Sequence, residues 1–194
     1  MDSLRIDFTT GSVAHRRRFG GGRGQALPRA VGMKSGPVPH VVDATAGLGR
    51  DAFLLASLGA RVTLIERSAH MHGLLQAALE KARESEFSEV IARMTLLHGD
   101  AKTLLPTLAP EVVLVDPMHP PRKNSALVKK EMRMIREIVG SDEDSVELMQ
   151  VALKVAQNRV VLKWPQRADL MPGINPPSHQ IPGKSTRYDV FMVG

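Results

Sequence analysis

Two short stretches of the sequence place residues where chemistry could occur. The first is residues 38–53, in which an apolar run ends at Asp43 and leads through small residues, Gly47 and Gly49 into a helix-like segment. This order predicts a strand, a tight turn and a helix start. The glycines would let a ligand approach backbone N–H groups at the positive end of the helix. A nucleoside-containing cofactor suits such a turn.

The glycine turn is compatible with two cofactors. The run Gly47-Leu48-Gly49-Arg50-Asp51-Ala52 satisfies the G-x-G-x-x-G/A pattern of nicotinamide dinucleotide sites. In that pattern the first glycine follows the strand directly, whereas here Asp43-Ala44-Thr45-Ala46 intervenes. A carboxylate at this point would repel a pyrophosphate but attract the sulfonium and ammonium groups of S-adenosylmethionine (SAM). We therefore favour SAM and keep NAD as the alternative.

Acidic residues also end or follow the neighbouring predicted strands. Glu66 ends the second strand, Asp100 follows the third and Asp116 follows the fourth. Because ligands of open α/β sheets bind beyond the carboxyl ends of the strands, we expect these acids and Asp43 to meet at one rim. There Glu66 would accept hydrogen bonds from ribose hydroxyls, and Asp100 from the adenine amine.

The second stretch is Asp116-Pro117-Met118-His119-Pro120. It resembles the [Asp/Asn]-Pro-Pro-aromatic motif of amino-methyltransferases, in which a side chain and a backbone carbonyl accept hydrogen bonds from an exocyclic NH2. The lone pair of such an amine is delocalised into the base, so acceptors must hold its hydrogens while the nitrogen attacks a methyl group in line. The catalytic candidates are Asp116, Pro117 and His119, with His119 stacking on the base less well than Phe or Tyr would.

Apolar periodicity predicts the elements that carry these residues. Strands alternate with helices, which predicts an α/β fold with a doubly wound, mostly parallel sheet and helices on both faces. We expect strands at residues 38–43, 60–66, 94–97, 112–115, 160–163 and 188–193, helices that end near Ser57, Arg83, Val139 and Gln157, and loops at residues 117–125 and 165–182.

Positive charge is concentrated in two segments. The net charge is +6, yet residues 1–36 and residues 121–136 each carry +5 and the remainder carries −4. This distribution indicates a surface for a polyanion, with a solvated helix face and a flexible tail as the alternative. The RNA-binding candidates are Arg16, Arg17, Arg18, Arg23, Arg122, Lys123, Lys129 and Lys130.

Residues 15–24 are basic and glycine-rich, with Phe19 as their one aromatic residue. Such a composition cannot bury enough apolar surface to fold by itself. We expect this run to order only against a partner, with phosphate favoured and a disordered linker as the alternative, within a basic, glycine-rich N-terminal segment of residues 1–36. Gly36-Pro37 would then mark the start of a folded domain of residues 37–194.

The composition also argues against several classes of protein. The chain has no cysteine, which excludes disulfides, thiolate nucleophiles and sulfur-ligated metal. Its histidines are scattered, and His70 and His72 would face different sides of a helix, so we expect no metal site. No apolar run reaches the roughly 18 residues of a membrane span. Without a secretory h-region, the expectation is a cytoplasmic protein with no membrane partner.

Several blocks, in order along the chain, resemble one known family. These blocks are residues 14–17, 19–24, 41–53, 66–67, 116–120 and 125–133. They are similar to the bacterial small-subunit (16S) ribosomal RNA guanine-N2 methyltransferases of the RsmJ type, over nearly the whole chain. The resemblance implies the Rossmann-like fold of class I SAM-dependent methyltransferases, with an antiparallel last strand. It also implies SAM as methyl donor and, as acceptor, a guanosine near the 3′ end of small-subunit rRNA, free or in the assembled subunit.

The resemblance further implies a set of cofactor contacts. Together with Asp43, Gly47 and Gly49 of the turn, the cofactor-binding candidates are Arg50, Asp51, Glu66, Arg67, Asp100, Ala101 and Asp116. Family members usually carry a longer stretch before the basic segment, and an aromatic residue is expected where His119 stands. The alternatives are a methyltransferase acting on another nucleic acid or a protein amine, an NAD-dependent oxidoreductase, and a non-catalytic RNA-binding factor.

Overall fold

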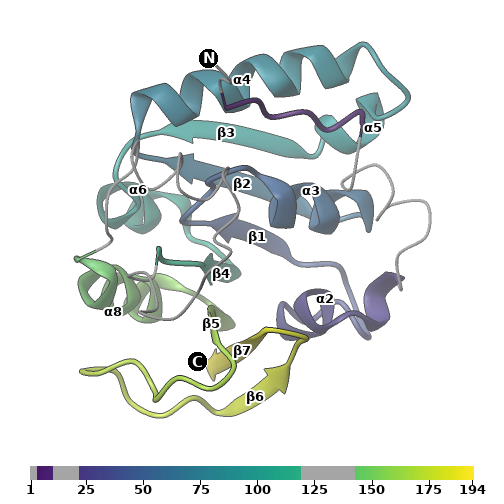
Figure 1. Cartoon of the computed structure of the whole chain (residues 1–194). Coiled ribbons are helices and arrows are strands. Elements are labelled where there is room, and N and C mark those ends of the chain that lie inside the picture. The colour runs from purple at the N-terminus through teal and green to yellow at the C-terminus, as the bar shows by residue number, and fades with distance from the viewer. Residues whose placement is uncertain (1–3, 11–21, 119–142) are drawn as a thin grey trace.

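The computed structural model describes residues 4–10, 22–118 and 143–194, and these residues are built around one sheet (Figure 1). Its strands, in sheet order, are β3 (Met94–His98), β2 (Arg61–Glu66), β1 (His40–Asp43), β4 (Val112–Val115), β5 (Arg159–Pro165), β7 (Thr186–Met192) and β6 (His179–Pro182). Strands β1 to β5 pair in parallel, whereas β7 runs antiparallel to both of its neighbours. The predicted mostly parallel sheet with an antiparallel last strand is confirmed.

Helices cover both faces of the sheet and make three layers (Figure 1). One apolar core lies between the sheet and the helices α2 to α5, and a second lies between the sheet and α6 and α8. Neighbouring residues of β1 divide between the cores, with Val41 in the first and Val42 in the second. The helices are α2 (Ala26–Ala30), α3 (Arg50–Ser57), α4 (Ala69–Arg83), α5 (Ser88–Ile91), α6 (Ala101–Leu108) and α8 (Ser145–Val155), with a 3-10 turn at Gly22–Gly24.

Part of the N-terminal segment packs into the first core. Phe8 is 1% exposed and its ring stacks on that of Phe53, with centroids 5.1 Å apart. Leu27, Val31 and Met33 are also buried in this core. Apolar contacts thus hold parts of residues 4–10 and 22–36 against the core. The expectation that phosphate orders residues 15–24 stays a prediction, because residues 11–21 lie outside the described residues. The division of the chain at Gly36-Pro37 stays a prediction.

The predicted strands and the helices around residues 51–57, 67–83 and 145–157 are confirmed to within a few residues. The loop predicted at residues 165–182 is wrong at its end, where β6 pairs with β7. The short helices α2, α5 and α6 were not predicted, and the helix expected at residues 126–139 lies outside the described residues. Within the described ranges, no helix combines the length and apolar character needed to cross a membrane.

Candidate active site

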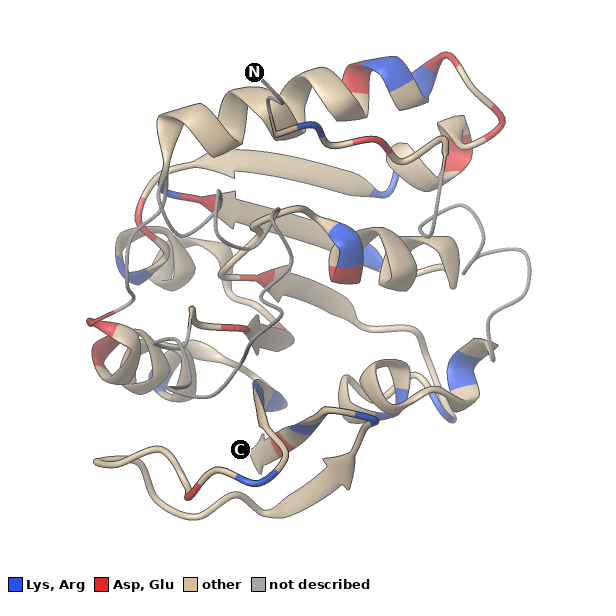
Figure 2. Cartoon of the chain, viewed as in Figure 1, with Lys and Arg blue, Asp and Glu red and all other residues tan. Residues whose placement is uncertain are grey.

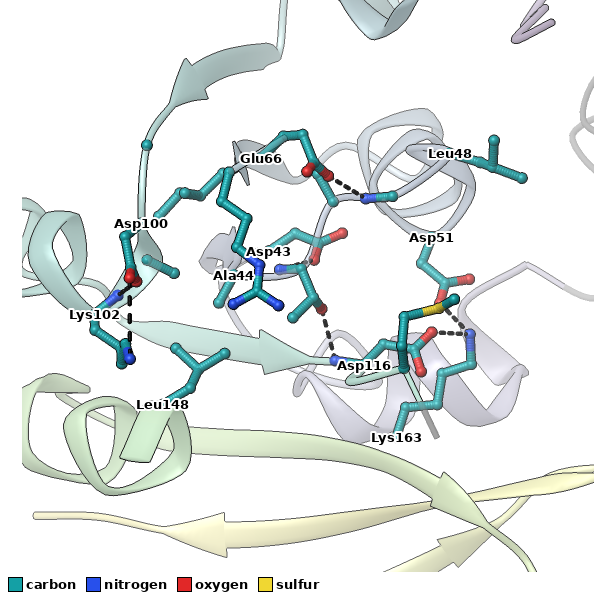
Figure 3. A pocket seen from close by; sticks show the side chains of 18 of the residues that line it. Asp43, Ala44, Leu48, Asp51, Glu66, Asp100, Lys102, Asp116, Leu148 and Lys163 are labelled. Carbon is teal, nitrogen blue, oxygen red and sulfur yellow. Dashed lines mark hydrogen bonds and ion pairs between the residues drawn. The ribbon is translucent and has the colours of Figure 1, made fainter. Parts of the chain in front are cut away.

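The carboxyl ends of β1, β2, β4 and β5 open onto a pocket of about 320 Å³ (Figure 3). The acids predicted to meet at one rim all line it. Asp43 is the last residue of β1 and Glu66 the last of β2, and both strands end in red in Figure 2. Arg50 and Asp51 reach the pocket from the start of α3, and Ala101 from the start of α6. The predicted cofactor residues that line the pocket are Asp43, Gly47, Arg50, Asp51, Glu66, Arg67, Asp100, Ala101 and Asp116.

The two glycines of the turn play different structural parts. Both have left-handed backbone angles, with φ +52° at Gly47 and +67° at Gly49. A Cβ on Gly47 would meet the Thr45 carbonyl oxygen at an ordinary 3.7 Å, and this glycine lines the pocket. A Cβ on Gly49 would lie 2.9 Å from a methyl carbon of Leu75 and 3.1 Å from the Phe8 ring. Gly49 thus faces the core, and the ligand space predicted beside both glycines is found beside Gly47.

This difference predicts unequal costs for the same substitution at the two positions. We expect Gly49→Ala to lower the free energy of unfolding by about 3 kcal/mol, since backbone strain adds to overpacking of a buried site. Gly47→Ala is the matched control and should cost about 1 kcal/mol, from backbone strain alone. Urea unfolding of the two variants measures both values. Equal losses would contradict the packing role of Gly49.

Glu66 joins the glycine turn to the start of α4. Its carboxylate is 4% exposed and accepts hydrogen bonds from the backbone N–H groups of Gly47, at 3.2 Å, and Ser68, at 2.8 Å. The Ser68 hydroxyl in turn accepts from the Met71 N–H and caps α4. These two hydrogen bonds fix the orientation of the Glu66 carboxylate at the pocket wall.

Asp100 caps α6, and a charged cluster lies beside it. The Asp100 carboxylate accepts from the Lys102 N–H at 2.8 Å, and the Lys102 ammonium lies 2.7 Å from an Asp144 oxygen. Arg67 donates to the same Asp144 carboxylate at 3.0 Å. The hydrogen bond from Lys102 lowers the pKa of Asp144. These half-exposed pairs contribute little to stability, but they tie the ends of β2, α6 and α8 together at the pocket wall.

Asp43 is the most deeply buried acid of the pocket. It is 3% exposed, and its carboxylate accepts a hydrogen bond from the Thr45 N–H at 3.1 Å. Burial, aided by the neighbouring carboxylates Asp51 and Asp116, raises the pKa of Asp43 to about 7, against the lowering effect of that hydrogen bond. A cation in the pocket would favour the ionised form of Asp43.

The raised pKa of Asp43 predicts a pH dependence of stability. Between its ordinary pKa of 3.8 and about 7, Asp43 is ionised in the unfolded chain but protonated in the folded one. The wild type should therefore lose stability as pH rises through this window, whereas Asp43→Asn should not. We expect the variant to gain roughly 2 kcal/mol relative to wild type between about pH 5 and pH 8. Urea unfolding at both pH values measures this, and a constant difference would contradict it.

Lys163, on β5, was not among the residues predicted for the site. Its ammonium lies 2.7 Å from Asp51 Oδ2 and 2.8 Å from Asp116 Oδ2 (Figure 3). Burial opposes the charge of Lys163, but the two carboxylates outweigh it and raise the pKa. A signal did exist in the sequence: Lys163 ends the apolar run Val160-Val161-Leu162, as Asp43 and Glu66 end theirs.

The residues predicted for the acceptor and for RNA are only partly described. Asp116 lines the pocket, and its backbone N–H donates to the Thr45 hydroxyl at 2.7 Å, whereas Pro117 is buried beside it. Arg23 is exposed outside the pocket lining and donates to the Leu58 carbonyl. The candidates that lie outside the described residues are Arg16, Arg17, Arg18, His119, Arg122, Lys123, Lys129 and Lys130.

Among the residues that the structure describes, no group of three or more His, Cys, Asp or Glu side chains is arranged to hold a metal ion.

Comparison with known proteins places this pocket in a familiar context. A family model described as "Putative SAM-dependent methyltransferase" matches residues 1–193. Two relatives named ribosomal RNA small subunit methyltransferase J are 68% identical over 191 residues, from Brucella anthropi, and 64% identical over 194 residues, from Agrobacterium fabrum. The alignments cover 97% and 99% of this chain, respectively, and 93% of each relative.

One solved structure is similar over the same extent. It is a SAM-dependent methyltransferase from Neisseria gonorrhoeae, 33% identical in sequence, with a TM-score of 0.74. The match covers 99% of this chain and 75% of that one.

Proposed function

Since the chain belongs to the SAM-dependent methyltransferase family that includes the ribosomal RNA small subunit methyltransferase J proteins, we propose that it methylates the exocyclic N2 amine of a guanosine in small-subunit rRNA. SAM is the cofactor and RNA the substrate class. We assign the reacting base to this pocket because Asp116 lines the same cavity as the glycine turn and Glu66. The acceptor amine and the cofactor can therefore meet there.

The charges of the residues that line the pocket fit SAM. Asp43, Glu66 and Asp116 give the strand ends an acidic character, and all three line the pocket. Carboxylates in this position suit a ligand with cationic groups and no phosphates. A pyrophosphate would face the same acids, which argues against the nicotinamide alternative. We propose that Glu66 holds the ribose hydroxyls and that Asp100 and Ala101 contact the adenine.

The proposed mechanism needs hydrogen-bond acceptors for the amine and no covalent intermediate. Bound SAM supplies a methyl group on a sulfonium, which an amine nitrogen can attack directly. Asp116 accepts a hydrogen bond from the N2 amine, with the Pro117 carbonyl as second acceptor, and together they align the nitrogen lone pair. The Thr45 hydroxyl accepts a hydrogen bond from the Asp116 backbone N–H and so fixes the position of the Asp116 backbone. Water takes the proton that the methylated amine releases.

The basic segments are proposed to bind the RNA backbone. Arginine pairs with phosphate oxygens through two parallel hydrogen bonds, and both basic runs flank parts of the chain that form the pocket. The acceptor is rRNA, either extracted or within the assembled small subunit. We place the enzyme in the cytoplasm, where ribosomal subunits are assembled in bacteria.

A transfer assay tests the proposed function. Labelled methyl groups from SAM would be offered to unmodified small ribosomal subunits and to RNA extracted from them, and the product nucleoside would be identified by mass. N2-methylguanosine in either substrate is the expected product. RNA that already carries the modification serves as the negative control, and any other methylated nucleoside would overturn the assignment to the N2 amine.

A further inference from the structure

Lys163 connects two acids that come from distant parts of the chain. Its ammonium pairs with Asp51, in the first turn of α3, and with Asp116, directly after β4. The three side chains converge at one end of the pocket (Figure 3). One acid follows the glycine turn, and the other is the acceptor proposed for the guanine amine. Lys163 thus links the cofactor side of the pocket to the acceptor side.

The burial of the three side chains argues against a purely stabilising role. Lys163 is 22% exposed, Asp51 20% and Asp116 38%. Taking such charges largely out of water costs much of what their attraction gains, so pairs of this kind are weak evidence for stabilisation. Their distances of 2.7 and 2.8 Å nevertheless fix the direction of both carboxylates. The arrangement is better suited to orientation than to stability.

The charges around Asp116 show what Lys163 prevents. Asp51 from α3 pairs with the same ammonium as Asp116, and the buried Asp43 from β1 interacts electrostatically with both acids. Tyr188 from β7 interacts with the same charges, and burial raises its pKa to about 12, so its hydroxyl stays neutral. The Lys163 charge acts on all four groups, Asp43, Asp51, Asp116 and Tyr188. Without it, neighbouring negative charges would favour protonation of Asp116.

We propose that Lys163 is a positioning residue for methyl transfer, which holds Asp116 ionised and correctly oriented to accept a hydrogen bond from the acceptor amine. The proposal rests on the proposed function, since it takes Asp116 as the acceptor. A protonated Asp116 would present a donor to the amine instead of an acceptor. A rotated Asp116 would no longer align the amine nitrogen, and a misplacement of about 1 Å can cost about 100-fold in rate.

The test compares Lys163→Met with Lys163→Arg, and Lys154→Met serves as the matched control, because Lys154 is an exposed lysine of α8 outside the pocket lining. We expect Lys163→Met to lower kcat by about 100-fold, with the Kd for SAM changed by less than about threefold. Lys163→Arg should restore most of the rate, because a guanidinium also pairs with carboxylates. The control should match wild type.

The pH profile separates positioning from simple structural support. The active form of Asp116 is ionised, so activity is lost as pH falls through its pKa. Loss of Lys163 should raise that pKa and move the acid limb of kcat to higher pH, while Lys163→Arg should keep the wild-type limb. If Lys163→Met does not fold, Lys163→Gln keeps a hydrogen-bond donor without the charge and should show the same shift.

The measurements distinguish failure of the role proposed for Lys163 from failure of the proposed function. Wild-type kcat and an unmoved acid limb in Lys163→Met or Lys163→Gln would overturn the role of Lys163. So would a rate loss that Lys163→Arg fails to restore at any pH. Absence of guanosine methylation by the wild type would overturn the proposed function instead, and SAM titration of each variant reports separately on the pocket.

Discussion

Replacing Asp116 with alanine is expected to lower the rate of methyl transfer about 1,000-fold while leaving the affinity for SAM nearly unchanged. The carboxylate is proposed to contact the acceptor amine, so its removal should affect the reacting state far more than cofactor binding. The pairing of Lys163 with Asp51 remains in this variant, and with it the arrangement of the pocket floor. Single-turnover transfer to rRNA and calorimetric titration with SAM measure the two quantities.

A matched control for this variant is Asp169→Ala, which removes an exposed carboxylate outside the pocket lining. Its transfer rate should equal that of the wild type. The transfer rate of Asp116→Asn should fall between the rates of Asp116→Ala and Asp169→Ala. The amide keeps one acceptor oxygen but lacks the charge that Lys163 pairs with. Transfer by Asp116→Ala at the parental rate would remove this residue from the mechanism.

Replacing Arg187 with methionine is expected to lower the free energy of unfolding by about 4 kcal/mol and the melting temperature by about 10 °C. Arg187 and Asp189 are 8% and 1% exposed, and their side chains form two hydrogen bonds, at 2.8 and 3.2 Å. Without the arginine, the Asp189 carboxylate stays buried without this cation. Arg187 also donates to the backbone carbonyls of Pro165, Gln166, Ala168 and Asp169, which would lose that donor.

Thermal and urea unfolding measure this effect against Arg167→Met, which removes an exposed arginine of the neighbouring loop. The double variant Arg187→Met/Asp189→Leu should recover part of the loss, since it removes the buried charge but leaves the loop carbonyls without their donor. A single variant that melts within about 1 °C of the control would show that the buried pair contributes little.

The rim of the sheet could be predicted from the sequence because its signal is local. Apolar, β-branched runs end abruptly in Asp43, Glu66 and Asp116, and a parallel sheet brings such ends to one edge. All three line the pocket, as does Asp100. The same pattern, an apolar run that ends in a charged residue, also marks Lys163. Its partners could not have been found, because Asp51 and Asp116 are 112 and 47 residues away along the chain.

The elements missed by prediction depend on contacts beyond their own residues. Strand β6 has one buried residue, Ile181, and exists through its pairing with β7. Helix α6 contains Pro106, which obscures its periodicity, although Asp100 before it is a good capping residue. Helix α2 is five residues long and packs against β6 and β7. Such short elements owe their stability to tertiary packing, which a local pattern does not reveal.

The stacking of Phe8 beneath the glycine turn has a consequence for how the protein is made. The Phe8 ring stacks on Phe53 and lies 3.1 Å from where a Cβ on Gly49 would be, so part of the floor under the turn comes from a segment that precedes the turn in the chain. Lys81, near the end of α4, pairs with Asp7 at 2.8 Å on the same segment. Asp7 is therefore synthesised 74 residues before its partner Lys81. We expect the cofactor turn to mature late during translation, once α4 has left the ribosome.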